Sequence, residues 1–209
     1  NNYQELWNWS VKYKDEFWES ILKYYKIDYS GKYKSVNSAP KNMYETRWFE
    51  GAEVNYAEHV FRNFSNENAA IVFKSESHEF EKISWKSLLS QTGKVANYLK
   101  SCGVKKGDRV CSMLPNSPEA IVAFLATNSL GAIWTSCSPD FGLKSILDRF
   151  SQIEPKVLIS INAYQYNGKI YNKIDELKEI TSSIPSITNV LLVNYIKGIN
   201  KDLMLHSYE

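Results

Sequence analysis

The sequence has few cysteines, and its glycines are not clustered. The three cysteines, Cys102, Cys111 and Cys137, form no C-x-x-C pair, which argues against a disulfide framework and against a zinc site. A phosphate-binding loop needs clustered glycines, whose backbone N–H groups can approach a phosphate closely, but the nine glycines here are scattered. The densest stretch, residues 103–108, lies between a predicted helix and a predicted strand, the reverse of a dinucleotide fingerprint. We expect a helix end and a turn there.

An excess of charge of one sign is also lacking. The formal net charge is +2, and Lys and Arg are spread along the chain without a basic block, so no nucleic-acid partner is expected. No apolar run approaches the roughly 20 residues that span a bilayer, and the N-terminus lacks the pattern of a signal peptide. We therefore expect a cytoplasmic protein with reduced thiols and no membrane partner.

Common catalytic motifs are absent as well. The three histidines, His59, His78 and His206, are far apart in the sequence, and no G-x-S-x-G or H-E-x-x-H pattern occurs. The residues by themselves therefore indicate no catalytic group and no metal site in this chain. Hydrophobic residues make up 44% and charged residues 23% of the chain, which is typical of a globular protein.

The first part of the chain differs in pattern from the rest. Apolar residues recur at helical spacing within residues 3–27, whereas residues 28–47 show no clear period. A short helical stretch is predicted at 55–64. We assign residues 1–66 to an N-terminal extension, partly helical and partly irregular, and residues 67–209 to a second domain.

The second domain shows alternating strand and helix patterns. A hairpin is predicted from strands at 69–73 and 79–83. Four further apolar strands are separated by helical stretches, and lie at residues 109–114, 132–135, 157–161 and 190–193. This alternation predicts an α/β fold with a mostly parallel sheet flanked by helices.

Several residues match the preferences of helix ends. Ser84 is an expected N-cap, and Gly103 is expected just past the end of the same helix. Ser117, followed by Pro118 and Glu119, predicts the next helix start. Ser138 and Asp140 are cap candidates for a helix at 143–153, although they also fit a simple turn.

Taken together, several stretches resemble the adenylate-forming acyl-CoA synthetases. They are SWKSL at 84–88, GVKKGDRV at 103–110, LPNSPEA at 114–120 and ATNSLGAI at 126–133. Their order is similar to the start of that superfamily's large AMP-binding domain, and the resemblance covers about residues 7–169. It implies that residues 67–209 are the first, incomplete part of such a domain.

Narrower runs resemble the acetoacetyl-CoA synthetase branch of that superfamily. They are RWFEGAEVNYAE at 47–58, WTSCSPDFG at 134–142, RFSQIEPK at 149–156 and YNGK at 166–169. Two alternatives stay open: a relative that uses acetate, propionate or another short acid, and a self-standing α/β module that binds a nucleotide or protein without catalysis. A Ser/Thr/Gly-rich loop further along the gene would separate enzyme from module.

The resemblance implies a two-step reaction on ATP, Mg²⁺, CoA and acetoacetate. The carboxylate attacks the α-phosphate of ATP to give an acyl-adenylate, and the CoA thiol then displaces AMP. The family does this with a Ser/Thr/Gly-rich phosphate loop, a magnesium-binding acid, an adenine and ribose pocket and a Lys on a mobile C-terminal domain. None of these has a counterpart in residues 1–209. We therefore expect an N-terminal fragment that is inactive alone and whose partners are the rest of its large domain and the C-terminal domain.

The resemblance also implies where CoA would lie. In acetyl-CoA synthetases CoA lies beside the segment before the Ser-Pro turn and beside cationic residues two elements later. Ser136, Cys137 and Lys169 hold those places here, while Tyr166 stands where a second cation would be useful. The alternative interpretation of Lys169 is an exposed turn residue without a role.

Overall fold

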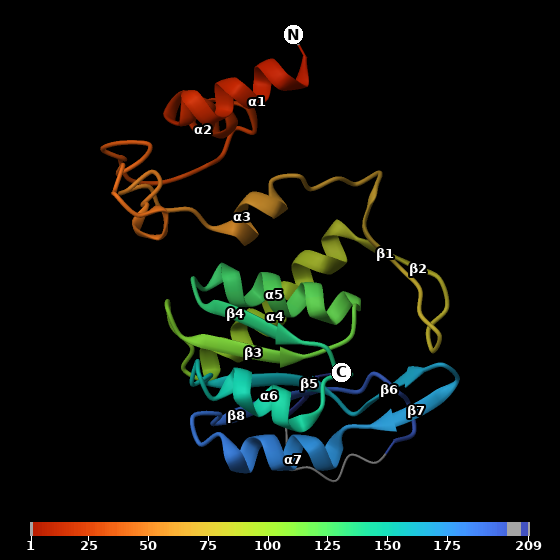
Figure 1. The fold of residues 1–209 in the computed structure, drawn as a ribbon. Helices are drawn as coiled ribbons and strands as arrows, with labels where there is room; N and C mark the ends of the chain where they lie inside the picture. Colours follow the sequence, from red (N-terminus) through yellow and green to blue (C-terminus); the bar gives the residue numbers. More distant parts are fainter. Residues whose placement is uncertain (1, 200–205, 209) are drawn as a thin grey trace. The chain divides into compact units, whose positions relative to one another are not determined.

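A computed structural model describes residues 2–199 and 206–208. The chain forms two compact units that divide between Asn55 and Tyr56. The first unit contains helices α1 (Tyr3–Lys12) and α2 (Lys14–Tyr24) and the short 3-10 helix η1 (Met43–Glu45) (Figure 1). The helical and irregular stretches predicted for this part are confirmed.

Aromatic side chains hold the first unit together. Trp9, Phe17, Trp18 and Trp48 form a series of edge contacts with ring centroids 5.5, 5.3 and 5.6 Å apart. The last contact joins α2 to the irregular segment that follows it. Within that segment, Trp48 also forms a β-bridge with Asn37. Contacts between aromatic rings therefore pack the irregular segment of this unit against its helices.

The second unit is built on a parallel sheet. Its strand order is β4-β3-β5-β8-β9, and every neighbouring pair is parallel. The strands are β3 (Arg109–Met113), β4 (Ile133–Cys137), β5 (Val157–Ile161), β8 (Asn189–Val193) and β9 (His206–Tyr208). The predicted α/β class is thereby confirmed, while β9 was not predicted and adds an edge to the sheet.

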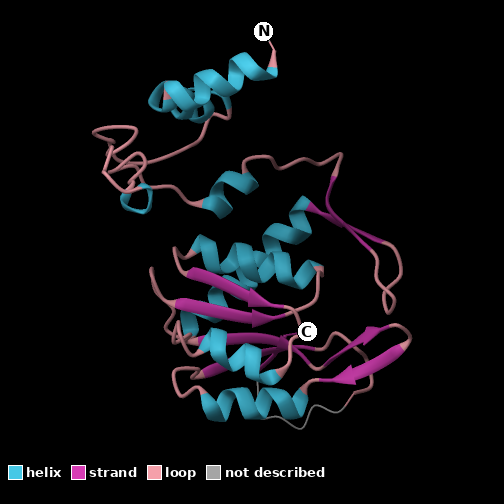
Figure 2. Cartoon of the chain, in the orientation of Figure 1, coloured by secondary structure: helices cyan, strands magenta, loops and turns pink. Residues whose placement is uncertain are grey.

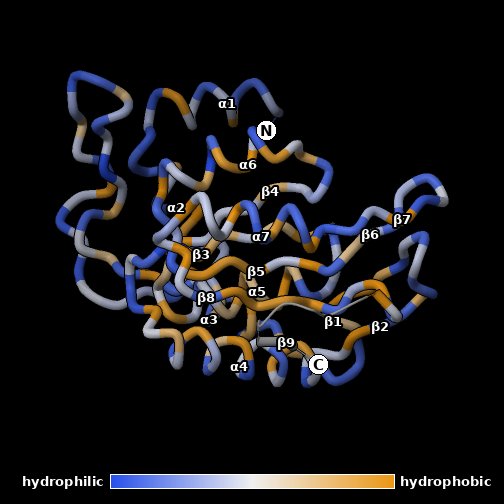
Figure 3. Tube along the Cα trace, turned by 90° about the horizontal axis from the view of Figure 1, so that it is seen from below, coloured by the Kyte–Doolittle hydropathy of each residue, from blue (hydrophilic) through white to orange (hydrophobic). Residues whose placement is uncertain are grey.

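Helices cover both faces of this sheet (Figure 2). On β5, Val157, Ile159 and Ile161 belong to the core that contains α4 (Trp85–Ser101) and α5 (Pro118–Ser129). Leu158 belongs to the opposite core, with α6 (Leu143–Phe150) and α7 (Ile174–Ser183). Successive side chains of a strand point to opposite faces, so a continuous apolar run is what a strand buried on both faces needs. Figure 3 shows hydrophobic stretches along these central strands.

Two antiparallel hairpins extend from the body of this unit. The predicted one is formed by β1 (Ala69–Phe73) and β2 (Glu81–Ser84). The other, β6 (Ala163–Tyr166) and β7 (Lys169–Asn172), was not predicted as a hairpin. Its two-residue turn has positive φ at both central positions, +49° at Asn167 and +73° at Gly168, which is the geometry that Asn-Gly favours.

The helix ends match the sequence predictions in part. Ser84 caps α4, because its Oγ accepts the backbone N–H of Ser87 at 3.1 Å. Neither cap candidate caps α6: its N-cap is Gly142. Ser138 donates to Asp140 Oδ2 at 3.0 Å within a turn, which confirms the alternative interpretation of these two residues. The helix also ends at Phe150, earlier than predicted, and β4 continues to Cys137.

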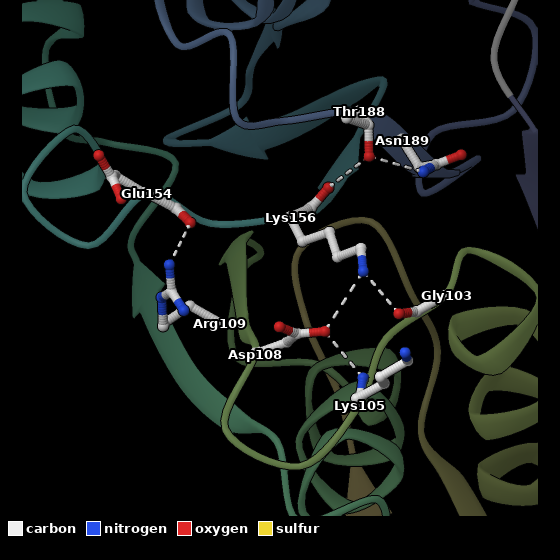
Figure 4. Close-up of polar contacts among 8 residues, drawn as sticks. All are labelled: Gly103, Lys105, Asp108, Arg109, Glu154, Lys156, Thr188 and Asn189. Atoms are coloured by element: carbon white, nitrogen blue, oxygen red, sulfur yellow. Dashed lines mark hydrogen bonds and ion pairs between the residues drawn. The ribbon is translucent and has the colours of Figure 1, made fainter.

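Polar contacts join the amino ends of the central strands (Figure 4). Lys156, just before β5, donates from Nζ to the carbonyl oxygen of Gly103 and lies 3.4 Å from Asp108 Oδ2. Arg109 at the start of β3 donates to the carbonyl oxygens of Ile153 and Glu154 at 2.6 and 3.0 Å. This end of the sheet is therefore held together by contacts within the chain.

Helix α3 (Tyr56–Phe61) completes the second unit. Tyr56 contacts Phe124 of α5, with ring centroids 5.4 Å apart, and Ala57 is buried in the core beneath. Phe124 in turn contacts Trp134 of β4 at 6.2 Å. These rings lead from the outer helix to the edge strand, next to the cleft described below.

Candidate functional site

A cleft of about 490 Å³ opens at the carboxyl end of the sheet. Its walls come from the ends of β3 and β4, the start of α5 and strand β6. In open parallel α/β sheets, ligands bind outside the carboxyl ends of the strands. Its position, together with the predicted site residues Ser136 and Cys137 in its lining, makes the cleft the candidate site of this chain.

The lining of the cleft is aromatic and polar, and no lysine or arginine is among the described residues that form it. The rings of Phe124, Trp134, Tyr164 and Tyr166 contribute apolar surface. Hydrogen-bonding groups come from Asn116, Ser136, Asp140 and Gln165. Such a lining suits an uncharged, partly planar group, whereas a phosphate would have to lie outside the cleft, at a cation on the rim.

Ser136 and Cys137 are consecutive residues of β4, so their side chains point to opposite faces of the sheet. Ser136 is exposed and pairs in register with Ser112 of β3. Cys137 lies in the opposite core with Met113, Ile146 and Phe150. Burial raises the pKa of its thiol, so Cys137 can face a ligand in the cleft through its backbone, not through sulfur.

Ser112 is a cleft residue that sequence reasoning missed. It is fully buried, and its Oγ has no hydrogen-bond partner among the described residues. A buried hydroxyl without a partner is costly, and here it lies on β3, an interior strand of the sheet. A polar residue between Cys111 and Met113 was the available signal in the sequence.

Lys169 lies at the rim rather than in the cleft. It is the first residue of β7 and pairs in register with Tyr166, which lines the cleft. Its side chain is exposed, as expected for a turn next to solvent. The structure thus brings Ser136 and Tyr166 together on the cleft, with Lys169 beside them on the neighbouring strand.

The turn before Lys169 carries a contact that the sequence did not indicate. The backbone N–H groups of Asn167 and Gly168 donate to the two carboxylate oxygens of Glu76, at 3.0 and 2.9 Å. Hydrogen bonds from Gly168 and Asn167 lower the pKa of Glu76, because they stabilise the charged form. Glu76 lies in the turn of the β1–β2 hairpin, 91 residues from Asn167.

Tyr164 of the cleft contacts both an aromatic ring and a cation. Its ring stacks on Tyr171 at 5.3 Å and lies 5.6 Å from Nζ of Lys173. Lys173 is nearly buried and is held 2.6 Å from Glu176. Burial, and then a hydrogen bond to Asp140, raise the pKa of Tyr164, because both favour the neutral hydroxyl.

A second hollow of about 990 Å³ lies along α4 and the residues after β8. It contains Lys86, Lys94 and Lys197, and none of the predicted site residues lines it.

Within residues 2–199 and 206–208, no group of three or more His, Cys, Asp or Glu side chains could hold a metal ion. In the same ranges, no helix combines the length and the apolar character needed to cross a membrane.

Two family models and several known proteins match this chain. The model of the AMP-binding enzyme family matches residues 57–204, and that of the acetyl-coenzyme A synthetase N-terminus matches residues 3–60. Mouse acetoacetyl-CoA synthetase is 40% identical over 197 residues, which cover 93% of this chain and 29% of the mouse protein. Malonamoyl-CoA synthetase of Penicillium aethiopicum is 33% identical over 96% of the chain and 29% of its own length.

A solved structure agrees with these sequence matches. Acetoacetyl-CoA synthetase from Streptomyces lividans superposes with a TM-score of 0.92 at 36% identity, and covers 99% of this chain. The chain spans only 32% of that structure. The resemblance found in the sequence motifs is thereby confirmed, and the chain corresponds to less than a third of such proteins.

Proposed function

Because the chain belongs to the AMP-binding enzyme family, we propose that the full-length protein is an ATP-dependent ligase that joins acetoacetate to CoA. The observation that carries the proposal is the 40% identity to mouse acetoacetyl-CoA synthetase over 93% of the chain. The Streptomyces lividans structure, similar over nearly the whole chain, supports the same activity. A self-standing binding module is disfavoured because these relatives are about three times as long.

The proposed reaction has two steps. The carboxylate of acetoacetate attacks the α-phosphate of ATP and releases pyrophosphate, and the CoA thiol then attacks the acyl-adenylate and releases AMP. Stabilising the charge on the phosphates requires cations and N–H donors, with Mg²⁺ as the expected metal. Among the described residues, no lysine or arginine lines the cleft, and no group of three or more His, Cys, Asp or Glu side chains could hold a metal ion. We therefore assign the phosphate loop and the magnesium ligand to the remainder of the large domain and the Lys to the C-terminal domain. The isolated chain is expected to be inactive.

We assign CoA binding as the contribution of residues 67–209. The cleft would take an uncharged part of CoA, with Ser136 and the backbone of Cys137 on one wall and the β6 aromatics on the other. Lys169 on the rim would then lie beside a CoA phosphate, since an ammonium group is a suitable point charge for one. Residues 1–66 would serve as the N-terminal extension, and the protein would work in the cytoplasm.

The second candidate is a ligase for another short acid. The similarity to a malonamoyl-CoA synthetase favours testing malonamate beside acetate and propionate. Malonamate carries an amide where acetoacetate carries a ketone, so an acyl pocket that accepts one is a small change from one that accepts the other.

The test is AMP release by the full-length protein with ATP, CoA and each acid in turn. Acetoacetate should give the highest kcat/KM, and no AMP should appear without CoA in multiple-turnover assays. An equal or higher kcat/KM for acetate, propionate or malonamate would move the assignment to that acid. AMP formation by the 209-residue chain alone would contradict the assignment of the ATP-binding groups to the rest of the protein.

A further inference from the structure

The tips of the two hairpins of the second unit lie side by side, although about 90 residues separate them in the sequence (Figure 3). The contact is made by one side chain from the β1–β2 turn and two backbone groups from the β6–β7 turn. Each carboxylate oxygen of Glu76 accepts one N–H, from Asn167 at 3.0 Å and from Gly168 at 2.9 Å. The pairing is therefore bidentate.

The β6–β7 turn is shaped for this contact. Asn167 and Gly168 both have positive φ, and successive N–H groups in such a conformation point toward one side, where they form an anion-binding concavity. Gly168 has nothing within 4 Å of the position where a Cβ would stand. The conformation of the turn, rather than lack of space, therefore explains glycine at this position.

The β1–β2 turn that carries Glu76 is itself held to the body of the unit. Ser75 and Tyr195 hydroxyls lie 3.3 Å apart, and the ring of His78 packs on Tyr195 with centroids 4.4 Å apart. Tyr195 is buried just after β8. Glu76 is thus fixed on its own side by two neighbours of the same turn, so it can act as a support for the other hairpin.

We propose that Glu76 is a positioning residue for CoA, which holds the β6–β7 hairpin so that its residues keep their places on the cleft. The supported strand β6 supplies Tyr164, Gln165 and Tyr166 to the cleft wall, and Lys169 starts the strand paired with it. The inference rests on the proposed use of this cleft for CoA. It does not depend on which acid is the acyl substrate.

The carboxylate is required for this role because both of its oxygens accept. A glutamine of the same shape offers one acceptor, and its NH₂ group would face the second N–H. An aspartate keeps both acceptors on a side chain that is one methylene shorter. Glu76→Gln should therefore loosen the hairpin more than Glu76→Asp does.

The experiment uses the full-length protein with Glu76→Gln and Glu76→Asp. Glu79→Gln, an exposed carboxylate change on the same hairpin, is the control. Hydrogen exchange of peptides covering residues 163–172 reports the hairpin, calorimetric titration with CoA reports binding, and ATP–pyrophosphate exchange reports the step before CoA. We expect faster exchange of the hairpin amides and CoA affinity weaker by about five-fold in Glu76→Gln. Glu76→Asp should lie in between, with Glu79→Gln and ATP–pyrophosphate exchange unchanged.

Several results would overturn the inference. Unchanged hydrogen exchange would show that the contact does not hold the hairpin, and faster exchange with unchanged CoA affinity would show that the hairpin does not serve CoA. Tighter CoA binding by Glu76→Gln would mean that Glu76 competes with a CoA phosphate for the turn. Failure of the proposed function looks different: wild-type protein would bind no CoA, or would bind it and ligate another acid.

Discussion

The ammonium group of Lys156 and the carboxylate of Asp108 lie 3.4 Å apart at the amino ends of β5 and β3. Asp108 Oδ2 also accepts the backbone N–H of Lys105 at 2.8 Å, and Lys156 donates to the carbonyl oxygen of Gly103. The pair therefore closes the loop between α4 and β3 onto the start of β5 (Figure 4). Hydrogen bonds, from Lys105 first and then from Lys156, lower the pKa of Asp108.

Asp108→Asn should reduce the free energy of unfolding by about 1 kcal/mol at neutral pH, because the pair is about one-third exposed and partly screened. A lowered carboxyl pKa stabilises the fold above the ordinary carboxyl pKa, and this contribution is lost as the pH falls through the folded-state pKa. The difference between wild type and variant in urea unfolding should therefore shrink between neutral and acidic pH. Asp148→Asn, an exposed change on α6, should stay within about 0.5 kcal/mol of wild type. A difference that grows toward low pH would contradict this account.

Two glycines with open space around them should respond oppositely to the same substitution. Gly93 lies in the middle of α4 and Gly168 in the β6–β7 turn, and a Cβ at either would meet nothing within 4 Å. Gly93→Ala should stabilise by about 0.5–1 kcal/mol, since alanine is the better helix former. Gly168→Ala should destabilise by about 1 kcal/mol, since its φ is +73°. Denaturant unfolding of both variants checks the signs, and a shared sign would show that φ is not the deciding factor.

The elements of the second unit could largely be predicted from the sequence because their periods are clear. β1 and β5 have the predicted bounds, since both are short apolar runs between turn signals. The β6–β7 hairpin was missed because AYQY and KIYN are short and half polar. The Asn-Gly pair between them carried the signal, and its two positive φ values account for it. The N-cap of α6 is Gly142, and Ser138 bonds to Asp140 within the turn before it.

The candidate site could be predicted only where it is local in sequence. Ser136 lies on the cleft because it follows Trp134 by two residues on an edge strand. The contact of Glu76 with Asn167 and Gly168 depends on where two hairpins meet in space, and no spacing in the sequence encodes that meeting. The opposite directions of Ser136 and Cys137 could have been inferred from strand periodicity, once β4 was known to reach Cys137.

Lys169→Ala should raise the KM for CoA several-fold in the full-length protein. The expected size is modest because an exposed ion contact contributes about 0.2–1 kcal/mol. ATP–pyrophosphate exchange should not change, since that half-reaction precedes CoA binding. Lys100→Ala, an exposed change in the last turn of α4, serves as the control for loss of a positive charge. An unchanged KM for CoA, or equal damage to both half-reactions, would show that Lys169 is only an exposed turn residue.

Substitutions at Ser136 and at Cys137 should have different effects, the first on CoA binding and the second on core packing. Ser136 faces the cleft from an exposed position, so Ser136→Ala should leave the unfolding free energy within about 0.5 kcal/mol of wild type. Loss of a hydroxyl that bonds an uncharged part of CoA should raise the KM for CoA by about three-fold to ten-fold.

Cys137→Ser changes one atom of a side chain that is buried with Met113, Ile146 and Phe150. The new hydroxyl would enter an apolar core, so the unfolding free energy should fall by about 1–3 kcal/mol. The KM for CoA should stay unchanged below the unfolding temperature, because only the backbone of residue 137 can reach the cleft. Urea unfolding and CoA titrations on full-length Ser136→Ala and Cys137→Ser measure both effects in both variants. A changed KM in Cys137→Ser, with unfolding unaffected, would place the thiol on the cleft and reverse the orientation of β4 described here.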